Sequence, residues 1–148
     1  MTGVEYLNQL KIMNIIIKQK ESEKEEIENK IYGISAVNFD MQKVKTSHNN
    51  NTYSLVDKYI DDKSSIERII AGNMNNKNYI ISLIQKLYEP KYIDLLYKRY
   101  VEFKSFNAIA VEMGYSLSHI MRLHCYAIRN FESKFAAEFK NMIVNDSK

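Results

Sequence analysis

The sequence predicts an all-α protein, with a long N-terminal helical hairpin followed by a small C-terminal helix-turn-helix domain. Three observations support this fold class. The 148 residues include only four glycines and one proline, which leaves little material for turns. Apolar residues recur at intervals of three and four over most of the chain, as they do in amphipathic helices. A stretch beginning at residue 106 has the residue types that a helix-turn-helix requires.

Composition narrows the class of protein further. The single cysteine, Cys125, excludes an internal disulfide, and the amino end lacks a secretory signal pattern, so we expect a cytoplasmic protein. No apolar run exceeds four residues, whereas a membrane span needs about 20. Residues 1–89 carry twelve basic and twelve acidic side chains, but residues 90–148 carry nine and six. The net charge of +3 therefore lies in the C-terminal part, and this favours an anionic partner there.

The first helix of the predicted hairpin begins near Tyr6 and ends near Gly33. Its inward positions are Tyr6, Leu10, Met13, Ile17, Lys20, Lys24, Ile27 and Ile31, so two lysines weaken its centre. The charged run "KQKESEKEEIENK", residues 18–30, has the alternation of a solvated helix face, with Glu26 and Lys30 spaced as an ion pair. A docking role for this charged face is the less favoured interpretation.

A polar loop is predicted at about residues 35–52, and its composition favours disorder. Lys43, Lys45 and His48 make this loop basic. The second helix of the hairpin begins near Ser54 and packs antiparallel on the first. The hairpin occupies residues 1–75 and the helix-turn-helix domain residues 78–143.

Between these two domains the segment 72–78, "GNMNNKN", is expected to break the helix or act as a hinge. A short helix then ends at Pro90. The next segment has Ile93, Leu96, Tyr100 and Phe103 at helical spacing, which predicts a further helix with these four on its buried face.

The helix-turn-helix prediction rests on seven positions, counted from Phe106 as the first. Ala110, fifth, is small enough for two helices to approach, and Gly114, ninth, permits a left-handed turn. Five apolar residues fill the inward places: Ile109, Met113, Tyr115, Ile120 and Leu123. Ser105 and Ser116 are placed to cap the two helices, and Tyr115 and Ile120 have the spacing of a hydrophobic staple. The second helix is expected to run for about 25 residues.

The outward face of this second helix is the candidate DNA-reading surface, because no acidic residue occurs between Glu112 and Glu132. The candidate base contacts are Ser116, Leu117, Ser118, Met121, Arg122 and Cys125. Arg122 is the strongest of them, since a guanidinium can bind the O6 and N7 of guanine together. The candidate phosphate contacts are Lys98, Arg99, Lys104, His119 and Arg129, with Ser116, Ser118 and Lys91 as further possibilities.

Other kinds of site find little support. His119 and His124 lie about 140 degrees apart around a helix, so they do not converge with Cys125 on a metal ion. No third group accompanies Cys125 to make a thiol nucleophile, and no phosphate-binding glycine loop or paired carboxylate occurs, so we expect no enzyme and no cofactor. Six tyrosines surround the motif. Base stacking on single strands is one use of them, and packing with the hydroxyl at the surface is the favoured one.

A stripe formed by Ile128, Phe131, Phe135, Phe139 and Met142 continues beyond the motif. It can pack on the N-terminal hairpin or form the seam of a homodimer, and the sequence leaves both open. A homodimer would place two reading helices about one turn of DNA apart.

The segment "LYEPKYIDLLYKRYVEFKSFNAIAVEMGYSLSHIMRLHCYAIRNF" resembles the helix-turn-helix of region 4 of bacterial sigma factors. It is more closely similar to small phage and prophage transcription regulators of the ArpU/RinA-like kind. The matching elements are "LLYKRY", "IAVEMGYS" and "HIMRLHCYAI", and the N-terminal "EYLNQLKIMNIIIKQKESE" and the loop "MQKVKTS" also look like that group. His119 and Met121 depart from the pattern, because such proteins often carry Arg, Lys or Gln there, and the phenylalanine stripe extends beyond the usual end.

The resemblance implies a sequence-specific regulator of phage or prophage genes, typically late ones, that binds double-stranded DNA on the bacterial nucleoid and engages RNA polymerase. Its reading helix would correspond to residues 116–129 here. The alternative is a non-enzymatic adaptor that binds a protein partner through the helical hairpin and does not bind DNA. Salt-dependent binding to duplex DNA separates the two hypotheses.

Overall fold

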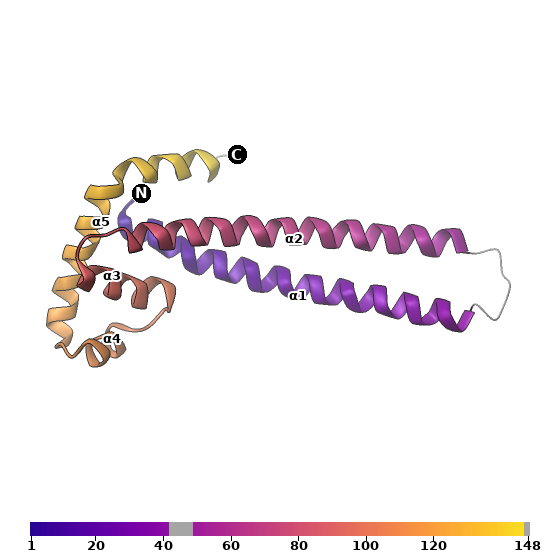
Figure 1. Ribbon diagram of the computed structural model, residues 1–148, viewed down its shortest axis with the longest axis horizontal. Helices are drawn as coiled ribbons and strands as arrows, with labels where there is room; N and C mark the ends of the chain where they lie inside the picture. The colour runs from indigo at the N-terminus through magenta and orange to yellow at the C-terminus, as the bar shows by residue number, and fades with distance from the viewer. Residues whose placement is uncertain (42–48, 147–148) are drawn as a thin grey trace. The chain divides into compact units, whose positions relative to one another are not determined.

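The fold is all-α, as the sequence predicts. The computed structural model describes the backbone of residues 1–41 and 49–146, and the side chains of residues 1–34 and 54–139. Its elements are α1 (Gly3–Met41), α2 (Asn49–Gln85), α3 (Pro90–Leu96), the π-helical turn η1 (Tyr97–Val101), α4 (Phe106–Met113) and α5 (Leu117–Asp146), shown in Figure 1. In the described part of the chain, no helix has the length and hydrophobicity needed to cross a membrane.

The chain divides into two compact units, and each of the two long helices contributes to both. Unit 1 comprises Met1–Met13 and Asn75–Lys148, and unit 2 comprises Asn14–Met74. The domain division expected from the sequence falls near residue 75. It assigns the first thirteen residues to the hairpin, whereas they belong to the unit that contains the helix-turn-helix.

Unit 2 is an antiparallel pair of helices, which lie side by side in Figure 1. Lys24 Nζ lies 3.4 Å from Glu67 Oε1, and Lys63 Nζ lies 3.2 Å from Glu28 Oε1. These ion pairs cross between the helices in one register and occupy the polar centre that the sequence predicts. The expected Glu26–Lys30 pair is present at 3.9 Å. Polar pairs inside a helical seam favour one register over others.

The predicted end of the first helix at Gly33 is wrong, because α1 continues to Met41. Gly33 is exposed with open space around it, and a glycine inside a helix costs about 1 kcal/mol without ending it. The predicted loop at about 35–52 is also wrong at both ends, since residues 35–41 belong to α1 and residues 49–52 to α2. Its remainder, residues 42–48 with Lys43, Lys45 and His48, lies outside the described residues.

The predicted break at 72–78 does not occur, because α2 is continuous from Asn49 to Gln85. The Asn73 side chain donates to the Ile69 carbonyl oxygen one turn earlier (2.9 Å), so this asparagine is satisfied within the helix. Pro90 does mark a boundary. It lies in the first turn of α3, where its missing N–H leaves no helical hydrogen bond unmade.

The larger core of unit 1 forms where the amino end of α1 meets the end of α2 and the middle of α5. The Tyr6 ring lies 4.7 Å from that of Phe139 and 6.0 Å from that of Phe131, measured between centroids. The buried members are Tyr6, Leu7, Leu10, Met13, Ile80, Leu83, Ile84, Leu87, Leu96, Tyr100, Ala127, Ile128, Phe131, Phe135 and Phe139. The stripe from Ile128 to Phe139 thus packs within unit 1, and α5 changes direction at Phe135 (φ −118°, ψ 24°).

The first turn of α1 is fixed on α5. Thr2 and Glu5 form a capping box, in which the Glu5 amide donates to Thr2 Oγ1 (3.2 Å) and the Thr2 amide to Glu5 Oε2 (2.8 Å). The Gly3 amide donates to Glu132 Oε1 on α5, at 2.7 Å. A carboxylate here satisfies an N–H that the helix cannot, and it complements the positive end of the helix dipole.

Candidate nucleic-acid interface

The first helix of the motif, α4, has the end signals that the sequence predicts. The Ala108 amide donates to Ser105 Oγ at 3.2 Å, so Ser105 is the N-terminal cap. At the other end Gly114 adopts a left-handed backbone (φ 72°, ψ 31°). The Tyr115 amide then donates to the Ala110 carbonyl oxygen (3.0 Å), which is the hydrogen bond of a glycine-ended helix. The tight turn therefore depends on a conformation that glycine adopts without strain.

The second helix of the motif, α5, starts with Ser116 as its cap. The His119 amide donates to Ser116 Oγ at 3.2 Å, and Ile120 is fully buried four residues into the helix. Tyr115, just before the cap, packs against the same cluster as Ile120, which agrees with the predicted staple. The cap and the staple together fix the direction in which α5 leaves the turn.

A small core holds α4 and α5 together. Its buried members are Leu95, Ile109, Ala110, Ile120 and Leu123, and partly buried Tyr92, Phe106, Met113 and Tyr115 pack against it. All five predicted inward residues, and Ala110, lie in or against this cluster. The helical spacing used for the sequence prediction includes Leu96 but not Leu95. The signal was present, because adjacent Leu95 and Leu96 cannot share one helix face, and the structure buries them in different cores.

The prediction that Phe103 lies on the buried face of the preceding helix is wrong. Its side chain is 42% exposed, and its backbone is left-handed (φ 58°), a conformation that costs a non-glycine residue about 1–2 kcal/mol. The chain leaves helical geometry after the π-helical turn η1, so the spacing that carries Ile93, Leu96 and Tyr100 no longer applies at residue 103.

The outward face of α5 holds the predicted base-contacting residues in exposed positions. Ser116, Leu117, Ser118, Met121, Arg122 and Cys125 are all exposed, and so is Arg129. Leu117 and Met121, each 45% exposed, are large apolar side chains that the cores do not use. Neither Arg122 nor Arg129 takes part in an ion pair among the described side chains. This face therefore offers cations and apolar groups without a neutralising acid.

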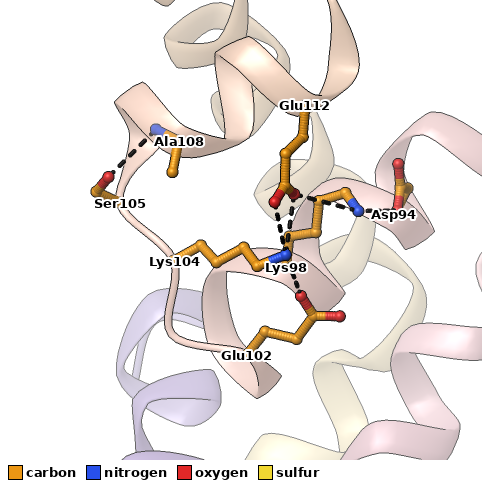
Figure 2. Close-up of polar contacts among 7 residues, drawn as sticks. All are labelled: Asp94, Lys98, Glu102, Lys104, Ser105, Ala108 and Glu112. Carbon is orange, nitrogen blue, oxygen red and sulfur yellow. Dashed lines mark hydrogen bonds and ion pairs between the residues drawn. The ribbon is translucent and has the colours of Figure 1, made fainter.

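Two predicted phosphate contacts lie in a cluster of opposite charges, drawn in Figure 2. Lys104 Nζ contacts Glu102 Oε2 (2.7 Å) and Glu112 Oε1 (2.8 Å). Lys98 Nζ contacts Asp94 Oδ1 (3.3 Å) and Glu112 Oε2 (3.5 Å). Glu112 on α4 thus bridges both lysines, which connects α4 to the η1 segment before it.

The cluster changes the acidity of its members in the directions that ion pairing requires. Hydrogen bonds that Lys104 donates to Glu102 and Glu112 raise its pKa to about 12, and the bond that Lys98 donates to Asp94 raises the pKa of Lys98. The bond with Lys104 lowers the pKa of Glu112. Three carboxylates surround two ammonium groups, so the cluster as a whole attracts phosphate poorly at neutral pH.

The other predicted phosphate contacts have different surroundings. The Arg99 guanidinium lies over the Phe106 ring, 4.1 Å from its centroid, and donates through Nη1 to the Lys104 carbonyl oxygen (3.1 Å). The His119 ring packs against that of Tyr115, with 4.6 Å between centroids. Lys91 Nζ lies 5.8 Å from the centre of the same tyrosine ring. Arg129 is exposed about one turn beyond Cys125.

His124 is held inside the motif by neighbouring aromatic rings. Its Nε2 lies 2.7 Å from Tyr100 Oη, and the Phe106 ring meets it edge-on at 4.9 Å. Burial, and then the positive charge of Arg99, lower the pKa of His124. Within the part of the chain that the structure describes, no three His, Cys, Asp or Glu side chains converge on a possible metal site.

The six tyrosines around the motif are divided between packing and exposure. Tyr100 is buried, and Tyr92, Tyr97 and Tyr115 are partly buried. Tyr88 and Tyr126 are exposed, on different elements. Four of the six rings therefore pack at least in part, although the Tyr100 hydroxyl bonds His124 instead of lying at the surface. The two exposed rings do not form a continuous stacking surface along one helix.

Comparisons of the chain with protein-family models, with curated proteins and with solved structures give no match.

Proposed function

We propose that the protein is a sequence-specific DNA-binding regulator of transcription that reads the major groove with α5. One observation carries the proposal: a capped, tightly turned helix pair presents a helix face that is exposed, free of acids, and equipped with Arg122, Ser118 and Met121. A helix fits the major groove, and these side chain types have partners on base edges there.

Arg122 is the principal base contact in this proposal. Its guanidinium is exposed in the second turn of α5, and a bidentate contact to guanine contributes about 1–3 kcal/mol of discrimination. Leu117 and Met121 on the same face suit the methyl groups of thymine. Ser116, Ser118 and Cys125 complete the surface that would determine which sequence is bound.

The phosphate contacts are assigned unequally. Arg129, Lys91 and His119 are the stronger candidates, because they lie outside the cluster around Glu112. Lys98 and Lys104 are the weaker ones, since binding a phosphate requires them to leave carboxylate partners. Arg99 keeps donors beyond the one that Lys104 uses, so it stands between these groups.

The biological setting that we propose follows the resemblance described for the sequence. The protein would control phage or prophage genes, typically late ones, in the bacterial cytoplasm and on the nucleoid. RNA polymerase would be its protein partner. A homodimer would bring two α5 helices to half-sites one turn of DNA apart, and this requires a pseudo-palindromic site.

A second candidate function, a protein adaptor, draws on exposed apolar residues of unit 2. Ile15, Tyr32, Leu55, Ile60, Ile69 and Met74 are large apolar side chains of the hairpin with much of their surface exposed. Such residues suit a protein partner more than DNA. In this alternative the helix-turn-helix would have a structural role only.

Fluorescence anisotropy with a random duplex, measured over a range of salt concentrations, tests the first proposal. We expect an affinity that falls steeply with salt, and a loss of about five-fold or more for Arg122→Ala on a selected sequence. Lys18→Ala, on an exposed position of α1, is the matched control and should bind normally. Failure of the wild-type protein to bind at low salt would reject DNA binding and favour the adaptor. If the protein binds DNA, selection from a random DNA pool would identify the bound sequence and its symmetry.

A further inference from the structure

We propose that unit 1 contains a binding site for a phosphate group that is separate from the reading face of α5 and shares only Arg99 with the DNA contacts proposed above. The site is a hollow of about 130 Å³ between the amino end of α1 and the η1 segment. Its lining residues are Leu7, Asn8, Lys11, Arg99, Tyr100 and Phe103. Phosphate is the ligand class that the charge, size and donors of this hollow fit best.

The charge of the lining is entirely positive. Lys11 comes from α1 and Arg99 from η1, and no carboxylate lines the hollow. Neither cation takes part in an ion pair among the described side chains. Asn8 adds an amide that can donate to an oxygen. Two cations and an amide from two elements match the donors that phosphate groups meet in proteins.

Arg99 is held in place before any ligand binds. Its guanidinium is stacked on the Phe106 ring, and one of its N–H groups bonds the Lys104 carbonyl oxygen. An arginine has five N–H donors, so most of them stay available. A guanidinium that is already oriented loses less conformational freedom on binding than a mobile one.

Two uncommon backbone features border the same hollow. Arg99 and Tyr100 belong to the π-helical turn η1, and Phe103 has a left-handed backbone. Both conformations are unfavourable in themselves and concentrate at functional sites. Here they place three of the six lining residues, and the exposed Phe103 ring forms part of the rim.

The volume of the hollow limits the size of the ligand that it can hold. Pockets for larger organic ligands have volumes of about 300–1,000 Å³. A hollow of about 130 Å³ holds one tetrahedral oxyanion but no complete nucleotide. The phosphate group can come from a free ion or small phosphate monoester, or from the backbone of a nucleic acid.

Titration with inorganic phosphate, followed by two-dimensional amide NMR at constant ionic strength, tests the site. We expect saturable shifts at amides of residues 7–11 and 99–103. Lys11→Gln should raise the dissociation constant about tenfold, as the loss of one charge-assisted contact predicts. Lys18→Gln, an exposed lysine of α1 outside the hollow, is the control and should bind as the wild type does.

A parallel titration with duplex DNA distinguishes the two sources. Saturation by phosphate alone identifies a free ion or monoester, and this result stands even if the protein binds no DNA. Weaker duplex binding by Lys11→Gln, without saturation by phosphate, identifies the nucleic acid backbone. Neither effect, or equal effects in Lys11→Gln and Lys18→Gln, would overturn the site.

Discussion

Tyr100 Oη and His124 Nε2 lie 2.7 Å apart and join the η1 turn to the helix that carries the candidate DNA-reading face. Burial raises the pKa of Tyr100 to about 12, so the tyrosine stays protonated at neutral pH. Which of the two groups donates depends on the tautomer of the imidazole, because a tyrosine hydroxyl can both donate and accept. Burial and the positive charge of Arg99 both oppose protonation of His124.

The first prediction concerns the pH dependence of stability. The pKa of His124 is lowered in the folded protein from the ordinary value of 6.5, chiefly by burial. The unfolded chain therefore takes up the proton first, and stability falls as pH drops from about 6.5 toward the lower folded pKa. The stabilising contribution is complete above about 6.5. Urea denaturation at a series of pH values measures the effect.

Substitution isolates the contribution of this histidine. His124→Phe removes the titration, so the decline in stability just below pH 6.5 should become shallower than in the wild type. His119→Phe removes a neighbouring histidine for which the structure gives no such hydrogen bond, and it serves as the control. An unchanged slope in His124→Phe would contradict the assignment.

The second prediction concerns the contact between Gly3 and Glu132. A β-carbon at residue 3 would lie 2.7 Å from Glu132 Cγ, a distance at which neighbouring atoms must move. Gly3→Ala should therefore destabilise the protein by about 1–3 kcal/mol, as overpacking does elsewhere. Gly33→Ala is the matched comparison, since nothing lies within 4 Å of that position. It should stabilise the helix by about 0.4–1 kcal/mol. Thermal denaturation of both variants against the wild type decides the matter.

The third prediction concerns a buried hydroxyl. The Tyr6 ring is fully buried, and its Oη has no hydrogen-bond partner within the described residues. Tyr6→Phe removes an unsatisfied polar group and keeps the ring, so stability should be unchanged or rise by up to about 1 kcal/mol. Tyr100→Phe should instead lower stability by about 1 kcal/mol, because it breaks the bond with His124. Equal losses in the two variants would show that the Tyr6 hydroxyl is bonded after all.

The fourth prediction rests on the proposed DNA binding and concerns Glu112. Glu112→Gln removes the carboxylate shared by Lys98 and Lys104 and leaves each lysine with one acidic partner, Asp94 and Glu102 respectively, so less negative charge competes with phosphate. Affinity for random duplex DNA should rise, and the salt dependence should steepen by up to about 2 in the log–log slope. Glu89→Gln removes an exposed acid outside the cluster and is the control. A decrease in affinity in Glu112→Gln would show that the cluster positions the motif for binding.

The sequence predicted the helix-turn-helix well because the constraints on it are local. Ser105, Gly114 and Ser116 act on amides and carbonyls within five residues, and the inward positions follow the helical period. The signals for capping and for a left-handed turn were therefore readable one motif at a time. Thr2 and Glu5, a capping box of the same kind, were overlooked although their spacing was visible.

The extent of the long helices was not predictable in the same way. Gly33 and the asparagines near residue 75 have weak helix propensities, which packing against a partner helix overrides. The prediction that Phe103 is buried was wrong because the π-helical turn just before it shifts the helical period. The ion pairs of Glu112 with Lys98 and Lys104 join residues 8 to 14 positions apart, and only the folded turn brings them together. A count of charges along the sequence does not show that these two lysines are paired, so it predicts them as phosphate contacts.

The adjacent leucines of α3 have a consequence for cooperativity. Leu95 is buried in the core of the motif and Leu96 in the core that contains Tyr6. The seven-residue helix α3 therefore contributes to both cores. Melting either core would expose the same short helix to water, and its remaining contacts are too few to keep it folded alone. We therefore expect the motif and the first thirteen residues of the chain to unfold in a single transition. The candidate reading helix would then depend, for its stability, on a segment from the opposite end of the sequence.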